Sequence, residues 1–179
     1  AKEKIEERVQ SVSQTLNLSS FLNMPARKLT ADQKQLISLG RGLVREDVAA
    51  VLMDEPLTVI DPDLKFKLRR SLKEINEQYK TTLVYVTHDQ NEAMTFADNI
   101  IVMDQGEIVQ VGLPKDLFEK PKTTFVGYFI GSPAMNLFNS EVVSNNSIKF
   151  SNLEINTKTD LSKIKNKKVK LGIRSEFIK

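Results

Sequence analysis

An acidic pair, Asp54 and Glu55, directly follows a short apolar segment at residues 49–53. The segment is too short for a helix and is typical of a fully buried strand, which Pro56 then ends. In an open parallel sheet, ligands bind at the carboxyl ends of the strands, so two adjacent carboxylates there are placed for metal and water chemistry. A solvated acidic loop is the alternative interpretation of the same residues.

The only histidine of the chain, His88, comes at the end of a second predicted strand, residues 82–87. Apolar residues between the two strands recur at helical spacing and predict a helix over residues 63–80. Strands joined by a helix are parallel neighbours, and their carboxyl ends lie at the same edge of the sheet. We therefore expect His88 to approach Asp54 and Glu55, whereas the alternative is a histidine that is merely packed or on the surface.

The remaining segments predict further helices and then short strands. Thr30 and Gln33 have the spacing of a capping box and predict the start of a helix. The other predicted elements are an amphipathic helix at about residues 5–16, the continuation of the Thr30 helix to about residue 44, short helices at 90–97, from 114 and at 123–130, a hairpin of 100–104 and 107–111, and strands at 137–143, 148–150, 153–157 and 168–173. The pattern indicates an α/β fold with a partial parallel sheet, followed by the start of a small all-β unit near Pro133.

The composition excludes several classes of protein. The chain has no cysteine, so neither disulfides nor thiolate metal sites contribute, and no apolar run approaches the roughly 20 residues that span a bilayer. The net charge of +3 is concentrated in residues 141–179, which hold 9 basic against 4 acidic residues. The lysine-rich stretch at 163–170 has no interleaved aromatic residue, which favours a solvated basic loop over a nucleic-acid-binding surface. We expect a cytoplasmic protein with no nucleic-acid partner.

Four segments occur in an order and spacing that resemble one protein family. They read LTADQKQLISLGRGLVRE, VLMDEPLTVID, LVYVTHDQNEAM and IIVMDQGEIVQVGLP. Together they resemble the nucleotide-binding subunit of ATP-binding cassette (ABC) transporters. The last segment, with the β-rich tail and the sequence from Gly172 to Glu176, is similar to the subtype that energises bacterial importers of sugars and related solutes. That subtype carries a regulatory β-domain of the oligonucleotide/oligosaccharide-binding (OB) type after the ATPase.

The resemblance implies a P-loop NTPase-type fold and its usual assembly. Residues 1–132 would be the C-terminal part of the nucleotide-binding domain, with a helical signature region at 1–48 and the Walker B and switch region at 49–132. Residues 133–179 would begin an OB-like regulatory domain. The implied cofactors are ATP and Mg²⁺, and the implied partners are a second ATPase subunit, in a homodimer or heterodimer, and transmembrane permease subunits. The protein would then lie on the inner face of the cell membrane, with the solute chosen by other subunits.

The family motifs also imply roles for single residues. Asp54 would hold Mg²⁺, Glu55 would orient or deprotonate the attacking water, and His88 would contact the γ-phosphate. Asp61 matches the loop that signals between the two ATP sites of the dimer, although an aspartate before Pro62 is equally a helix cap.

The signature segment departs from the family pattern. It ordinarily reads Leu-Ser-Gly-Gly-Gln and contacts the ATP bound to the other subunit, whereas here Leu29 is followed by Thr30, Ala31, Asp32 and Gln33. Both glycines, which let backbone amides approach a phosphate, are replaced, and Asp32 adds a like charge. We expect a weakened site, so that a homodimer has two impaired sites. The alternative function is that of a non-catalytic or regulatory ABC subunit.

No Gly-x-x-x-x-Gly-Lys phosphate loop occurs in the chain. In the family this loop precedes the region that is matched here. We therefore expect a fragment of a parent ATPase, and the fragment by itself is expected to bind ATP weakly or not at all and to be inactive.

Overall fold

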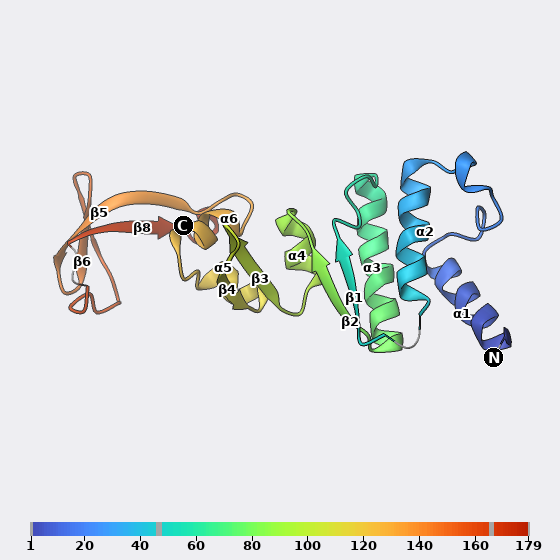
Figure 1. Cartoon of the computed structure of the whole chain (residues 1–179). Coiled ribbons are helices and arrows are strands. Elements are labelled where there is room, and N and C mark those ends of the chain that lie inside the picture. The colour runs from blue at the N-terminus through green and yellow to red at the C-terminus, as the bar shows by residue number, and fades with distance from the viewer. Residues whose placement is uncertain (1, 46–47, 165–166, 179) are drawn as a thin grey trace. The chain divides into compact units, whose positions relative to one another are not determined.

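The computed structural model describes residues 2–45, 48–164 and 167–178, and the chain divides into two compact units (Figure 1). We call residues 1–96 unit 1 and residues 97–179 unit 2. This division falls inside the predicted Walker B and switch region at 49–132, and the domain boundary near Pro133 stays a prediction. Among the described residues, no helix combines the length and the apolar character that crossing a bilayer requires.

Unit 1 consists of helices and one pair of parallel strands. Its elements are α1 (Lys2–Thr15), a short 3-10 helix (Ala26–Lys28), α2 (Ala31–Leu43), β1 (Ala50–Asp54), α3 (Pro62–Tyr79), β2 (Thr82–Val86) and α4 (Gln90–Phe96). β1 and β2 pair in parallel from Ala50 opposite Thr82 to Asp54 opposite Val86. The predicted strand–helix–strand arrangement is confirmed, with Asp54 as the last residue of its strand rather than the first residue after it.

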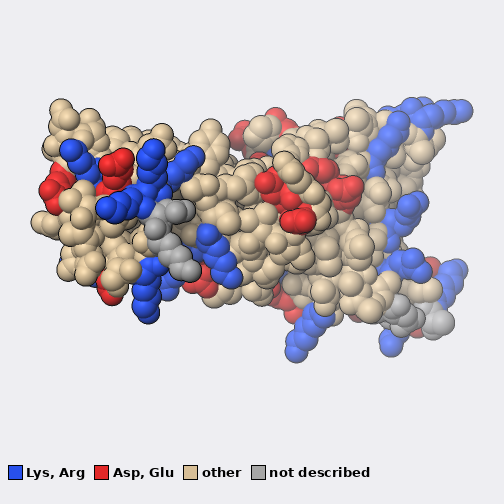
Figure 2. Space-filling view, turned by 60° about the vertical axis from the view of Figure 1, so that its left-hand side comes forward, with Lys and Arg blue, Asp and Glu red and all other residues tan. Residues whose placement is uncertain are grey.

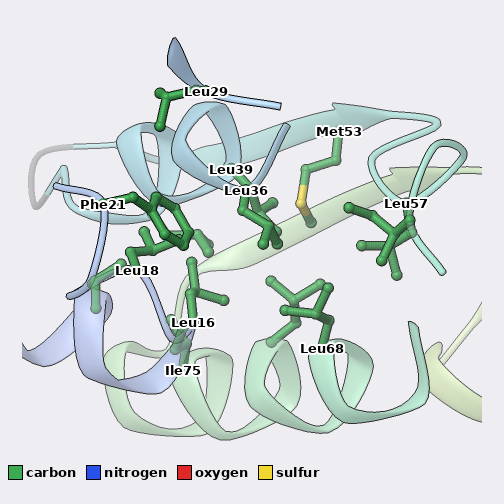
Figure 3. Packing of buried hydrophobic residues seen from close by; sticks show 14 residues of the cluster. Leu16, Leu18, Phe21, Leu29, Leu36, Leu39, Met53, Leu57, Leu68 and Ile75 are labelled. Atoms are coloured by element: carbon green, nitrogen blue, oxygen red, sulfur yellow. The ribbon is translucent and has the colours of Figure 1, made fainter. Parts of the chain in front are cut away.

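The core of unit 1 lies where α1, α2 and α3 meet one face of this sheet (Figure 3). Leu36 from α2 and Leu68 from α3 point toward one another across this apolar layer, and Met53 reaches it from β1. Leu68 is 1% exposed, and burying a leucine side chain stabilises a fold by about 1.5–3 kcal/mol. The core therefore fixes one face of the strands that carry the acidic pair and the histidine.

The other face of the sheet is open to solvent in the described part of unit 1. Leu52 is 77% exposed, and Val84 and Val86 are also exposed, whereas Met53 is 6% exposed. The prediction of a fully buried strand at residues 49–53 is therefore wrong. The reason is that side chains alternate between the two faces of a strand, and the helices of unit 1 cover only one of them.

Unit 2 begins with a hairpin and ends with an antiparallel sheet. Its elements are β3 (Ile100–Asp104), β4 (Glu107–Gly112), α5 (Pro114–Glu119), α6 (Thr124–Phe129), β5 (Asn136–Ser144), β6 (Ser147–Phe150), β7 (Leu153–Asn156), β8 (Lys168–Ile173) and a short 3-10 helix (Ser175–Phe177). The four-stranded sheet has the order β7-β6-β5-β8. The predicted hairpin and the predicted run of short strands are confirmed.

Arg174 connects the end of β8 to the helices of unit 2. It is 2% exposed, its Nε donates to the carbonyl oxygen of Phe118 at 2.8 Å, and its guanidinium lies 4.0 Å from the centroid of the Phe118 ring. Such cation–π stacking favours a buried arginine. Gly131 has a φ of +117°, and a β-carbon there would meet Arg174 Nη1, so the position favours glycine.

Basic side chains gather on the surface of the β-rich part of unit 2, beside carboxylates of the same region (Figure 2). Lys149, Lys168 and Lys170 line a groove of about 650 Å³ together with Glu141. Lys168 and Lys170 lie on β8, in agreement with the predicted strand at 168–173, so the basic stretch 163–170 is not a loop throughout. Residues 165–166 of that stretch lie outside the described residues.

Candidate active site

Glu55 occupies a constrained position immediately after β1. Its backbone N–H donates to the carbonyl oxygen of Val86 at 2.9 Å, which extends the β1–β2 ladder by one residue. Its φ is +48°, a left-handed conformation that costs a non-glycine residue about 1–3 kcal/mol and is often found at functional sites. A tight turn follows, in which the Thr58 hydroxyl donates to Glu55 Oε2 at 2.9 Å. The backbone and one carboxylate oxygen of Glu55 are therefore fixed.

The other carboxylate oxygen of Glu55 meets His88. The backbone N–H of His88 donates to Glu55 Oε1 at 3.0 Å, and His88 Nδ1 lies 2.6 Å from the same oxygen. We call Glu55 and His88 the strand-end pair. Its formation confirms the expected approach of the histidine to this acid. The His88 side chain remains 78% exposed, so the ring is accessible to a ligand.

The contact shifts the pKa values of both groups. The hydrogen bond to Glu55, reinforced by its negative charge, raises the pKa of His88 above its ordinary value. Burial raises the pKa of Glu55, but the hydrogen bonds from His88 and Thr58 outweigh that effect and leave it below its ordinary value. The arrangement therefore favours a carboxylate beside an imidazolium.

Asp54 lies next to the pair but faces different neighbours. It is exposed and borders a small pocket of about 150 Å³ with Gln35, Ser38 and Pro56. Gln35 Nε2 donates to the carbonyl oxygen of Pro56 at 3.1 Å and so ties α2 to the loop after Glu55. The described residues contain no cluster of three or more metal-ligating side chains. Since Mg²⁺ needs only one or two carboxylates when water and phosphates supply its other ligands, an accessible Asp54 fits that ion.

Residues 30–33, which we call the helix-start turn, form a separate local cluster at the beginning of α2. The Thr30 N–H donates to Gln33 Oε1 at 3.1 Å, as a capping box requires, and Ala31 is the first helical residue. The Thr30 hydroxyl donates to the carboxylate of Asp32, and this bond lowers the Asp32 pKa. Within the described part of the chain, these bonds stay inside the turn and do not join it to the strand-end pair.

Asp61 acts as the N-cap of α3. Its carboxylate accepts from the backbone N–H of Asp63 at 3.0 Å, and Pro62 takes the first helical position. The helix cap, one of the two roles that the sequence allowed for Asp61, is therefore present. The signalling role of Asp61 stays a prediction.

One buried acidic residue was not predicted from the sequence. Glu92, on α4, is 3% exposed and lies among hydroxyl and basic groups from β2 and α3. Its only sequence signal is its place four residues after His88 in the first turn of a short helix. That signal does not reveal burial, because the partners come from elsewhere in the chain.

Comparisons with known proteins bear on the fold and the family of the chain. The family described as "MalK OB fold domain" matches residues 131–178. The solved structure of cbiO1 from Clostridium perfringens, described as part of the ABC transporter complex cbiONQ, is similar over 67% of this chain and 47% of that chain, with a TM-score of 0.59 and 25% identity. The α/β fold of the matched residues is thus that of the ATP-binding cassette class.

Proteins of similar sequence point to one group within this class, the import ATP-binding proteins. The sn-glycerol-3-phosphate import ATP-binding protein UgpC of Brucella abortus is 48% identical over 139 residues, which cover 78% of this chain and 39% of that protein. UgpC of Escherichia coli is 40% identical over 180 residues, covering 99% and 50%. The oligosaccharides import ATP-binding protein MsmX of Bacillus subtilis is 43% identical, covering 79% and 38%. Over most of its length the chain matches part of the ATP-binding subunits of ABC importers, and it spans at most half the length of these relatives.

Proposed function

We propose that the chain is part of an ATP-hydrolysing subunit of an ABC importer for sugars or related solutes such as glycerol phosphate. The observation that carries the proposal is the 2.6 Å contact between His88 Nδ1 and Glu55 Oε1 at the carboxyl ends of two parallel strands. It joins the two residues that the family motifs assign to hydrolysis. The names of the relatives support the class of solute.

The directions of the pKa shifts support different catalytic roles for Glu55 and His88. Because its pKa is lowered, Glu55 is better suited to orienting the attacking water than to holding its proton. Because its pKa is raised, His88 is protonated more often than a free histidine, and the protonated ring can donate to the oxygens of the transferred phosphoryl group, whose charge needs stabilising in the transition state. Asp54 would hold Mg²⁺, which would neutralise phosphate charge.

The proposed assembly needs groups from other polypeptide segments. A second ATPase subunit would close over the nucleotide, and permease subunits would carry the solute across the membrane, with this subunit on the inner face. Because the chain has no glycine–lysine phosphate loop, the 179-residue chain should show no micromolar affinity for Mg-ATP in calorimetry. Micromolar binding would contradict this assignment of the phosphate contacts.

A chimera tests the proposed hydrolysis. Residues 1–179 would replace the matching half of Escherichia coli UgpC, which supplies the remaining part of an ATP-binding subunit, and phosphate release would be measured. We expect hydrolysis that Glu55→Gln slows by orders of magnitude. The matched control is Glu74→Gln, since Glu74 is an exposed acid of α3 that contacts only Arg70 on its own helix among its described partners. Equal rates for the two variants would overturn the proposal.

The helix-start turn favours a second candidate, a regulatory or non-catalytic ABC subunit. The Thr30 hydroxyl donates to Asp32 and is therefore not free to donate to a phosphate. In the chimera, Asp32→Gly should raise hydrolysis several-fold if the altered turn limits the rate. The control is Asp160→Gly, because Asp160 is also an exposed aspartate bonded to a nearby hydroxyl, that of Ser162. An unchanged rate for Asp32→Gly would remove the argument for this candidate.

A further inference from the structure

Glu92 is a buried carboxylate on a helix of only seven residues. Taking a charged group out of water is costly unless every polar atom finds a partner, so a buried glutamate at this place needs a reason. Both of its carboxylate oxygens have partners from other elements. The role of Glu92 can therefore be read from those partners.

One carboxylate oxygen of Glu92 accepts hydrogen bonds from two hydroxyl groups, one on β2 and one on the residue that directly follows β2. Tyr85 Oη donates to Glu92 Oε2 at 2.8 Å, and Thr87 Oγ1 donates to the same oxygen at 3.0 Å. Burial, followed by the hydrogen bond to Glu92, raises the pKa of Tyr85. The second oxygen faces α3, with Lys65 Nζ at 3.4 Å and Arg69 Nη1 at 4.0 Å from Oε1. The carboxylate thus joins β2, α3 and α4.

Hydrogen bonds connect Glu92 to the residues before and after His88. Thr87, the residue before His88, donates directly to Glu92. Asp89, the residue after it, donates its N–H to Thr87 Oγ1 at 3.0 Å, and its carboxylate accepts the N–H of Glu92 at 3.3 Å. The backbone on each side of His88 is therefore connected to one buried group, while the His88 ring itself is exposed.

We propose that Glu92 is a positioning residue for His88. It holds the turn between β2 and α4 against α3, so that the N–H and the imidazole of His88 both meet Glu55 Oε1. This deepens the proposed function and rests on it, because a group that contacts a transferred phosphoryl must be held within about 0.5 Å of its productive place. Thr87 transmits the constraint, whereas Tyr85 ties Glu92 to the strand two residues farther from the histidine.

The test uses two variants that each remove one hydroxyl donor to Glu92 without changing the charge, Thr87→Val and Tyr85→Phe. His88 is the only histidine, so the NMR signals of its ring report on one site in the 179-residue chain. We expect Thr87→Val to shift the ring signals and to lower the titration midpoint of His88 toward that of a free histidine, because the contact with Glu55 loosens. Tyr85→Phe should leave both close to the original values.

Glu92→Gln and thermal unfolding complete the test. Glu92→Gln should shift the His88 ring signals in the same direction as Thr87→Val, and if that variant does not fold, Thr87→Val alone decides. A purely structural Glu92 predicts that both hydroxyl variants lower the melting temperature while the His88 signals stay unchanged, and that outcome overturns the proposal. In the UgpC chimera, Thr87→Val should lower kcat at unchanged KM for ATP. A chimera without hydrolysis would refute the proposed function but leave the NMR result on Glu92 intact.

Discussion

The end of β1 and the start of α2 each hold an acidic side chain through a threonine hydroxyl, but the two arrangements differ in what they depend on. Thr58 donates to Glu55, and Thr30 donates to Asp32. Glu55 is also bonded to His88, 33 residues away along the chain, whereas the side-chain partner of Asp32 is two residues away. The strand-end pair therefore exists only when unit 1 is folded, while the helix-start turn needs only its own few residues.

The largest effect on this comparison should come from Glu55. In the UgpC chimera, Glu55→Gln keeps the size of the side chain but removes the carboxylate that would orient water. We expect the hydrolysis rate to fall on the order of 10³-fold, within the range for loss of a positioned acid or base. Phosphate release at saturating ATP measures it. A fall of less than tenfold would place the chemistry elsewhere.

The second-largest effect on the hydrolysis rate should come from His88. His88→Ala removes one donor to the transferred phosphoryl group, a change that typically costs about 10²-fold in rate. The same phosphate-release assay applies, with nucleotide binding measured separately to show that the variant still takes up ATP. Should His88→Ala hydrolyse ATP at the original rate, the histidine would be only a partner of Glu55.

A smaller effect concerns stability and its dependence on pH. The lowered pKa of Glu55 contributes stability above its ordinary value of 4.5, and this contribution is lost as the pH falls through the folded value. The raised pKa of His88 contributes stability below its ordinary value of 6.5, and this is lost as the pH rises through the folded value. The pair therefore stabilises unit 1 most between pH 4.5 and 6.5.

Urea unfolding of the 179-residue chain and of His88→Asn checks this window. The difference between their midpoints should be larger at about pH 5.5 than at about pH 9, because the contribution of His88 is lost as the pH rises through its folded pKa. It should be small even at its maximum, because the ring is mostly exposed and solvent screens the pair. A difference that grows toward pH 9 would reverse the assigned directions.

The smallest effect is expected at the helix-start turn. Asp32→Ala in the 179-residue chain should leave the His88 NMR signals unchanged and alter the urea midpoint only slightly, because the bonds of Asp32 are local and exposed. Lys34→Ala, one turn into the same helix, is the neighbouring surface control. A change in the His88 signals for Asp32→Ala would show that the two regions are coupled, and the comparison would fail.

The sequence was sufficient to predict that His88 approaches Glu55, because a helix between two strands requires parallel pairing and a shared edge. It was not sufficient for Glu92, since Lys65 and Arg69 become its partners only when α3 packs beside α4. The exposure of Leu52 was missed for a related reason. The sequence pattern of an apolar strand is the same whether or not a second layer covers its outer face, and only tertiary structure distinguishes the two cases.

That outer face gives the sheet of unit 1 an amphiphilic character. Leu52, Val84 and Val86 present branched hydrocarbon to water beside one another on the parallel strands, while Met53 on the opposite face is buried. An exposed apolar stripe of this kind favours association with other apolar surfaces, so these three side chains should lower the solubility of the 179-residue chain.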